Sequence, residues 1–177
     1  MLNIVTQNLD PAMFPQRSTR LPRTQKNAQT DTRAPLRVIS IQRGITGAAP
    51  MPLPLFASRV PAGFPSPADD YVDQRLDLNT HLVEHPAATF FTRVSGHSMR
   101  GAGIHDGDLL IVDRALEPQD GRIVIAAVNG ELTVKRLRFR KNGTWLVPEH
   151  PDYKPLKITE GLDCMIWGVV TRVIHAV

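Results

Sequence analysis

The distribution of proline divides this chain into two parts that differ in their capacity to fold. Ten of its fifteen prolines fall within residues 1–67, and residues 17–35 mix Arg, Thr, Gln, Asn and Pro almost without apolar periodicity. Such a composition buries too little apolar surface to offset the entropy that is lost on ordering. We therefore expect residues 1–36 to be disordered, with no room for a helix-turn-helix.

The basic charge of the chain lies in the same leader. Residues 1–62 carry eight Lys/Arg and two Asp/Glu, a net charge of +6, whereas residues 63–177 carry thirteen and fifteen, a net charge of −2. The overall charge of +4 therefore does not describe the remainder of the chain. Because no apolar run of 18 or more residues and no secretory signal is present, we expect a soluble, cytoplasmic protein. The single cysteine, Cys164, excludes an internal disulfide and a multi-cysteine metal site.

From Gly63 onward, short apolar runs alternate with turn residues. Asn129-Gly130 is a type I′ turn signal between the strand-like runs 122–128 and 131–140. The pattern predicts a mostly β domain of short antiparallel strands and hairpins over residues 63–177, with one short helix or turn beginning at Asn79. In the leader, the apolar segments 36–45 and 51–60 could dock on this domain as extended strands.

Ser98 is the candidate nucleophile. It lies in the glycine-flanked loop 95–101, where glycines let backbone N–H groups approach a substrate carbonyl as an oxyanion site requires. Arg100 replaces the glycine of a nucleophile elbow and Gly101 replaces the lysine of an S-x-x-K pair, so the base must come from elsewhere. Because such loops are more often simple connections, that alternative stays open.

Lys135 is the candidate base. The period of two in strand 131–140 puts this lysine on the more apolar face and three arginines on the other: Thr133, Lys135, Leu137 and Phe139 against Arg136, Arg138 and Arg140. Desolvation there would lower its pKa, so that a neutral amine could accept the serine proton. The alternative is a lysine whose stem packs while its amino group reaches water.

The histidines predict no further site. His97 adjoins Ser98, but neighbours in an extended segment point to opposite sides, so His97 is expected to be an ordinary loop residue. His81 and His85 have a helical metal-ligand spacing, yet no partner segment completes a site. We therefore expect no metal and no cofactor.

Several segments, in order from about Pro54 to Val173, resemble the UmuD branch of the LexA/UmuD family of self-cleaving serine peptidases (S24). They include Ala62-Gly63-Phe64-Pro65-Ser66-Pro67-Ala68, His85-Pro86-Ala87-Ala88-Thr89, Ser95-Gly96-His97-Ser98-Met99, Glu131-Leu132-Thr133-Val134-Lys135-Arg136-Leu137 and Trp167-Gly168-Val169-Val170. The resemblance implies the mostly β peptidase fold of the family. It also implies a dyad of Ser98 as nucleophile and Lys135 as general base, which cuts between Ala62 and Gly63.

The resemblance also implies partners. In the family, a RecA-type recombinase filament on single-stranded DNA stimulates cleavage. The trimmed homodimer then joins a UmuC-type Y-family polymerase for translesion synthesis in the SOS response. The chain departs from the family in its leader, which is far longer than the usual arm. Residues 1–35 are thus an extension or the result of a misassigned start.

Two other function classes remain open. A LexA-like repressor would need a folded DNA-reading domain, for which the leader offers no recognition helix. A non-catalytic β module would use the basic leader to bind nucleic-acid phosphates in a salt-sensitive, sequence-independent way.

Overall fold

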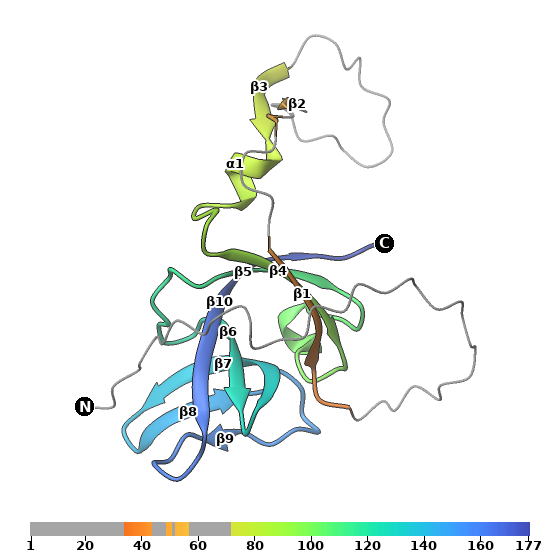
Figure 1. Ribbon diagram of the computed structural model, residues 1–177. Coiled ribbons are helices and arrows are strands. Elements are labelled where there is room, and N and C mark those ends of the chain that lie inside the picture. Colours follow the sequence, from red (N-terminus) through yellow and green to blue (C-terminus); the bar gives the residue numbers. More distant parts are fainter. Residues whose placement is uncertain (1–33, 44–48, 51, 57–71) are drawn as a thin grey trace, which may run out of the picture.

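The computed structural model describes residues 34–43, 49–50, 52–56 and 72–177, which form a mostly β structure (Figure 1). This confirms the predicted fold class. In chain order the elements are β1 (Arg37–Arg43), β2 (Pro52–Phe56), β3 (Val72–Asp77), α1 (Leu78–Leu82), β4 (Thr89–Ser95), a 3₁₀ turn (Arg100–Ala102), β5 (Leu109–Asp113), β6 (Ile123–Val128), β7 (Glu131–Arg140), β8 (Gly143–Val147), β9 (Leu156–Lys157) and β10 (Cys164–Ile174). No helix in these ranges is long and apolar enough to cross a membrane.

The main sheet has eight strands in the order β1-β4-β5-β10-β6-β7-β8-β9. Its pairings are antiparallel, and β1 also pairs with β7 through Arg37 and Thr133. The strands β1, β4, β5, β10, β6 and β7 therefore close into a ring. β1 pairs with β4 along almost the whole length of that strand and with β7 at one residue pair, although β4 and β7 are not neighbours in the strand order.

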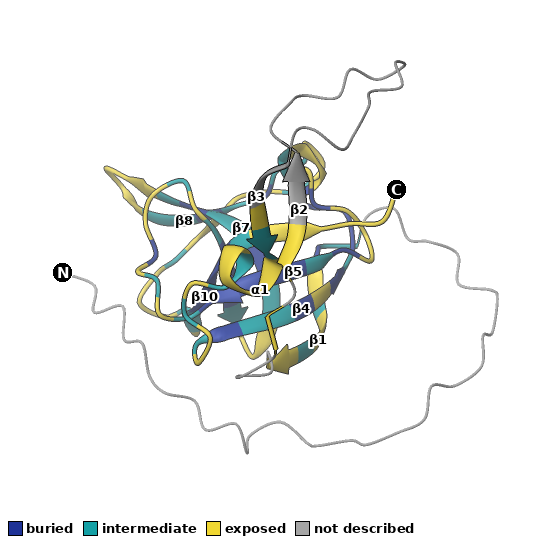
Figure 2. Ribbon diagram, turned by 90° about the horizontal axis from the view of Figure 1, so that it is seen from above, coloured by how far each residue is buried: buried dark blue, intermediate teal, exposed yellow. Residues whose placement is uncertain are grey.

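The remaining two strands, β2 and β3, form a separate antiparallel hairpin. Figure 1 shows this hairpin beyond α1, away from the main sheet, and Figure 2, which is seen from above, shows the hairpin projected over that sheet. Between its strands lie residues 57–71, which are outside the described residues and include Ala62 and Gly63. The predicted scissile bond therefore has no structural description.

The core consists of two clusters of buried side chains on the main sheet. Removing this apolar surface from water is the main favourable contribution to folding. The first cluster contains Leu36, Val94, Met99, Ile104, Leu110, Val112, Ile125, Val134, Trp167 and Val170. The second contains Val124, Ala126, Leu137, Leu146 and Val169. In β7, Val134 and Leu137 belong to different clusters, as expected for a strand buried on both faces.

The predicted type I′ turn is present, since Asn129 and Gly130 both have positive φ, 49° and 81°. At two other points the structure differs from the local predictions. The helix, however, begins earlier than predicted, because Asp77 rather than Asn79 is the N-cap and its side chain accepts from Asn79 N. The expectation of disorder throughout residues 1–36 is wrong for Leu36, which is fully buried.

Candidate active site

Ser98 lies in the turn between β4 and the 3₁₀ turn that starts at Arg100. Asp106 holds the start of this turn, since its Oδ1 accepts from Ser95 Oγ at 2.7 Å and from Gly96 N at 2.8 Å. The bond from Gly96 and the bond from Ser95 lower the pKa of Asp106. On the other side, the Ser98 carbonyl accepts from Glu149 N at 2.8 Å. The backbone around Ser98 is therefore fixed from both directions.

Lys135 reaches Ser98 from the middle of β7. Its Nζ lies 3.0 Å from Ser98 Oγ, and it also donates to Thr133 Oγ1 and to the Val134 carbonyl, both at 2.9 Å. Burial lowers the pKa of Lys135 to about 8, because the charged ammonium is desolvated. The structure thus brings together the two residues that the sequence singled out.

The three contacts of Lys135 suit both protonation states. An ammonium group has three N–H donors, which match the three acceptors Ser98, Thr133 and Val134. When the amine is neutral, two N–H groups can stay on Thr133 and Val134 while the lone pair faces the Ser98 hydroxyl. In that state the amine can accept the Ser98 proton, which is the role of a general base.

A segment of the leader lies against this pair. Leu36 N donates to Ser98 Oγ at 3.0 Å, and the Leu36 carbonyl accepts from Thr133 Oγ1 at 3.1 Å and from Val134 N at 3.3 Å. Sequence reasoning placed an apolar docking segment at residues 36–45 but did not connect it with Ser98. The partners are 62 and 97 residues away from Leu36, and no local pattern reports such pairings.

His97 is a loop residue, as expected, and its side chain is buried. Its Nδ1 has no hydrogen-bond partner within the described residues. Its backbone N–H donates to the Ala34 carbonyl at 3.1 Å. The structure therefore gives His97 no hydrogen bond to the hydroxyl of Ser98.

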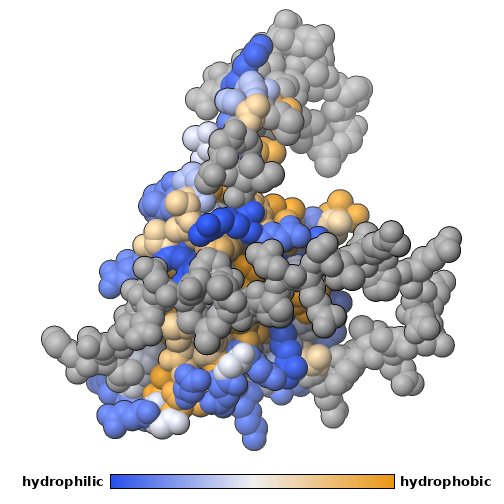
Figure 3. Space-filling model, viewed as in Figure 1, coloured by the Kyte–Doolittle hydropathy of each residue, from blue (hydrophilic) through white to orange (hydrophobic). Residues whose placement is uncertain are grey.

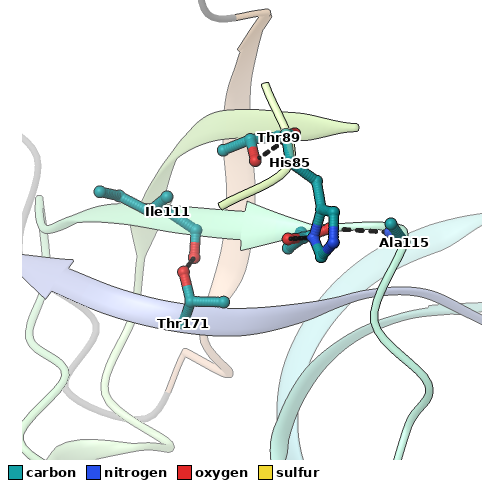
Figure 4. Close-up of polar contacts among 6 residues, drawn as sticks. His85, Thr89, Ile111, Ala115 and Thr171 are labelled. Atoms are coloured by element: carbon teal, nitrogen blue, oxygen red, sulfur yellow. Dashed lines mark hydrogen bonds and ion pairs between the residues drawn. The ribbon is translucent and has the colours of Figure 1, made fainter. Parts of the chain in front are cut away.

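The other histidines lie elsewhere. His85 Nδ1 contacts Asp113 Oδ2 at 2.7 Å, and Asp113 Oδ1 accepts from Ala115 N (Figure 4). The hydrogen bond to Asp113 raises the pKa of His85. His81 is in the last turn of α1. A separate group that the sequence did not indicate, His105, Asp108 and His175, brings ligand-type atoms within 4.8 Å of one another.

Cys164 is partly buried, and burial raises the pKa of its thiol. A raised pKa disfavours the reactive thiolate, which fits a structural residue.

Comparison with known proteins places the chain in a family. Residues 54–171 match the family model described as Peptidase S24-like. Protein ImpA of Escherichia coli is 54% identical over 123 residues, which cover 69% of this chain and 83% of ImpA. Protein SamA of Salmonella typhimurium strain LT2 is 51% identical over 122 residues, 69% of this chain and 84% of SamA. Protein MucA of Escherichia coli is 47% identical over 121 residues, which cover 68% of this chain and 82% of MucA. The chain belongs to the Peptidase S24-like family and is a self-cleaving serine peptidase of the UmuD type that acts in SOS mutagenesis.

Proposed function

We propose that Ser98 is the nucleophile and Lys135 the general base, and that together they cut the bond between Ala62 and Gly63 to release residues 63–177. The observation that carries this proposal is the 3.0 Å contact between Lys135 Nζ and Ser98 Oγ. It is supported by burial of the lysine, which lowers its pKa to about 8. A serine hydroxyl is a weak nucleophile until an adjacent base takes its proton.

The reaction proceeds through an acyl-enzyme. Neutral Lys135 takes the proton of Ser98 as Oγ attacks the Ala62 carbonyl carbon, and the lysine then gives a proton to the departing nitrogen of Gly63. Water hydrolyses the ester on Ser98 by the same proton transfers. The N–H groups of Ser98 and Met99 donate to no protein acceptor in the described part of the chain, so they are available to stabilise the oxyanion.

The product acts within the SOS mutagenesis machinery. We expect a cytoplasmic homodimer whose cleavage is stimulated by a RecA-type filament and which binds a UmuC-type polymerase. Supporting a dimer, Val173 and Ile174 on β10 are 37% and 43% exposed. On the face that Figure 3 shows, hydrophobic and hydrophilic residues are mixed. Light scattering before and after cleavage would reject the dimer if it gave a monomer at micromolar concentration.

Substitution of the two residues tests the proposed chemistry. Ser98→Ala and Lys135→Ala should each abolish self-cleavage, and by similar factors, because members of one catalytic unit are not additive. Lys135→Arg should also fail, since a guanidinium does not lose its proton in this range. Lys141→Ala, at an exposed lysine just after β7, is the matched control and should cleave at the wild-type rate.

Circular dichroism of each variant separates lost chemistry from lost structure. If folded Lys135→Arg cleaves like the wild type, Lys135 is not the base. If folded Ser98→Ala still cleaves, the dyad is rejected altogether. If the wild type does not cleave itself and Ser98→Ala leaves every other activity intact, a non-catalytic binding module is favoured.

A further inference from the structure

We propose that residues 34–37 are an internal inhibitor of the peptidase, an extended strand that occupies the position beside Ser98 and has to leave before the segment around Ala62 can bind. This proposal rests on the assignment of Ser98 and Lys135 made above. It goes beyond that assignment by giving the leader a regulatory role.

The segment is bound as extended peptides are bound by proteins, through main-chain hydrogen bonds on both sides. The Ala34 carbonyl accepts from His97 N at 3.1 Å and from Tyr153 OH at 2.8 Å. Arg37 then pairs with Ser95 of β4 and with Thr133 of β7. Together with the contacts of the Leu36 carbonyl, these bonds anchor the segment from Ala34 to Arg37.

The Leu36 side chain adds an apolar anchor. It is completely buried in the first core cluster, together with Val94, Met99 and Ile104. Ile39, two residues beyond Arg37 on the same strand, is by contrast 59% exposed. Burial of one leucine side chain shifts a docking equilibrium by about tenfold or more. Leu36 therefore holds the segment in place, whereas Ile39 does not.

The bound segment blocks the nucleophile rather than presenting a bond to it. Ser98 Oγ accepts from Leu36 N and lies within hydrogen-bond distance of Lys135 Nζ, both at 3.0 Å. When Lys135 is neutral and accepts from the Ser98 hydroxyl, the N–H of Leu36 still occupies one of the two lone pairs of Ser98 Oγ, and the backbone of residues 34–37 fills the space beside it. The Pro35 carbonyl oxygen instead packs against Gly96. A Cβ added to Gly96 would lie only 2.3 Å from this oxygen. Because Gly96 N donates to Asp106, it does not polarise that carbonyl.

The leader segment also imitates the predicted cleavage segment. Ala34-Pro35-Leu36-Arg37 has the same apolar-Pro-apolar order as Val60-Pro61-Ala62-Gly63, but it carries Leu and Arg where the scissile pair has two small residues. Only one backbone can accept from Val134 N and Thr133 Oγ1 in this geometry. Occupancy by residues 34–37 therefore lowers the rate by the fraction of molecules in which the site is covered.

The test compares two aspartate substitutions in the 177-residue chain. Leu36→Asp puts a carboxylate into the apolar cluster and should release the segment, so self-cleavage after residue 62 should be about tenfold faster or more. Ile39→Asp, on the exposed position of the same strand, is the control and should cleave at the wild-type rate. A wild-type rate in folded Leu36→Asp would overturn the proposal.

Two further measurements keep the test decisive. A synthetic peptide of residues 34–43 should slow cleavage of Leu36→Asp, and the same peptide with Leu36→Asp should not. If Leu36→Asp does not fold by circular dichroism, Tyr153→Phe replaces it, because it removes the hydroxyl that donates to Ala34 and should accelerate cleavage several-fold. An unchanged rate in that variant, or a product that begins at Leu36, would overturn the proposal.

The double variant Leu36→Asp/Ser98→Ala separates this inference from the assignment on which it rests. It should not cleave at all. If it cleaves, the assignment of Ser98 has failed. If it does not cleave while Leu36→Asp matches the wild type, only the inhibitory role has failed.

Discussion

Self-cleavage in the absence of any activator should rise with pH until Lys135 is neutral. Burial lowers the pKa of Lys135 to about 8. About one molecule in ten then carries a neutral amine at pH 7, and about nine in ten do at pH 9. If the rate follows this fraction, it increases about tenfold between those pH values and changes little above them. An unperturbed lysine would be neutral at pH 7 in fewer than about one molecule in a thousand.

The assay is the first-order loss of intact chain at half-unit intervals of pH, followed by intact mass. Ser98→Ala at each pH corrects for hydrolysis that does not use the site, and circular dichroism confirms that the chain stays folded. Leu36→Asp should give faster rates with an inflection at the same pH. The reason is that Lys135 remains the base when residues 34–37 are released. An inflection well below pH 8 would point to a base other than Lys135, and one above pH 10 would contradict desolvation of Lys135.

Three predictions concern stability. Leu110→Ala, at a fully buried position, should lower the free energy of unfolding in urea by about 2–5 kcal/mol. Gly168→Ala would place a Cβ 2.7 Å from Val112 Cγ1 and should cost about 1–3 kcal/mol in the same assay, and an unchanged midpoint would contradict the packing. His85→Ala should destabilise the fold more at pH 5.5 than at pH 9. The hydrogen bond to Asp113 raises the pKa of His85, so its contribution is complete below the unfolded pKa and is lost as pH rises through the folded one. Equal losses at both pH values would refute this.

Local sequence signals predicted most of the β domain. The paired positive φ values at Asn129 and Gly130 are what an Asn-Gly dipeptide favours, and β7 covers the predicted residues 131–140. The alternation in β7 also put Lys135 on the same face as Thr133 and Leu137, where burial desolvates its amino group. The face of β7 that carries the three arginines was predicted less well. It also carries Val134, which is fully buried, so this face is covered as well. A period of two assigns residues to faces but does not tell which faces are covered.

The leader could not be predicted in the same way. Its composition is typical of disorder, and this outweighed the short apolar segment that begins at Leu36. Leu36 is ordered because Ser98 and two residues of β7 form hydrogen bonds with it from far away in the chain, and the core supplies an apolar environment. Burial of His97 is likewise a property of the packed structure. Composition and periodicity describe neighbours in sequence, so they do not predict contacts between residues that are far apart in the chain.

Intact mass of the products from the wild-type chain, incubated with and without a recombinase filament on single-stranded DNA, identifies the scissile bond, and the same measurement on variants identifies the residues that cut it. We expect a fragment of residues 63–177 in the wild type and in Lys141→Ala, and only intact chain in Ser98→Ala and Lys135→Ala. A cut at another bond would contradict Ala62-Gly63 as the scissile bond, and a fragment of residues 63–177 from folded Ser98→Ala would contradict Ser98 as the nucleophile.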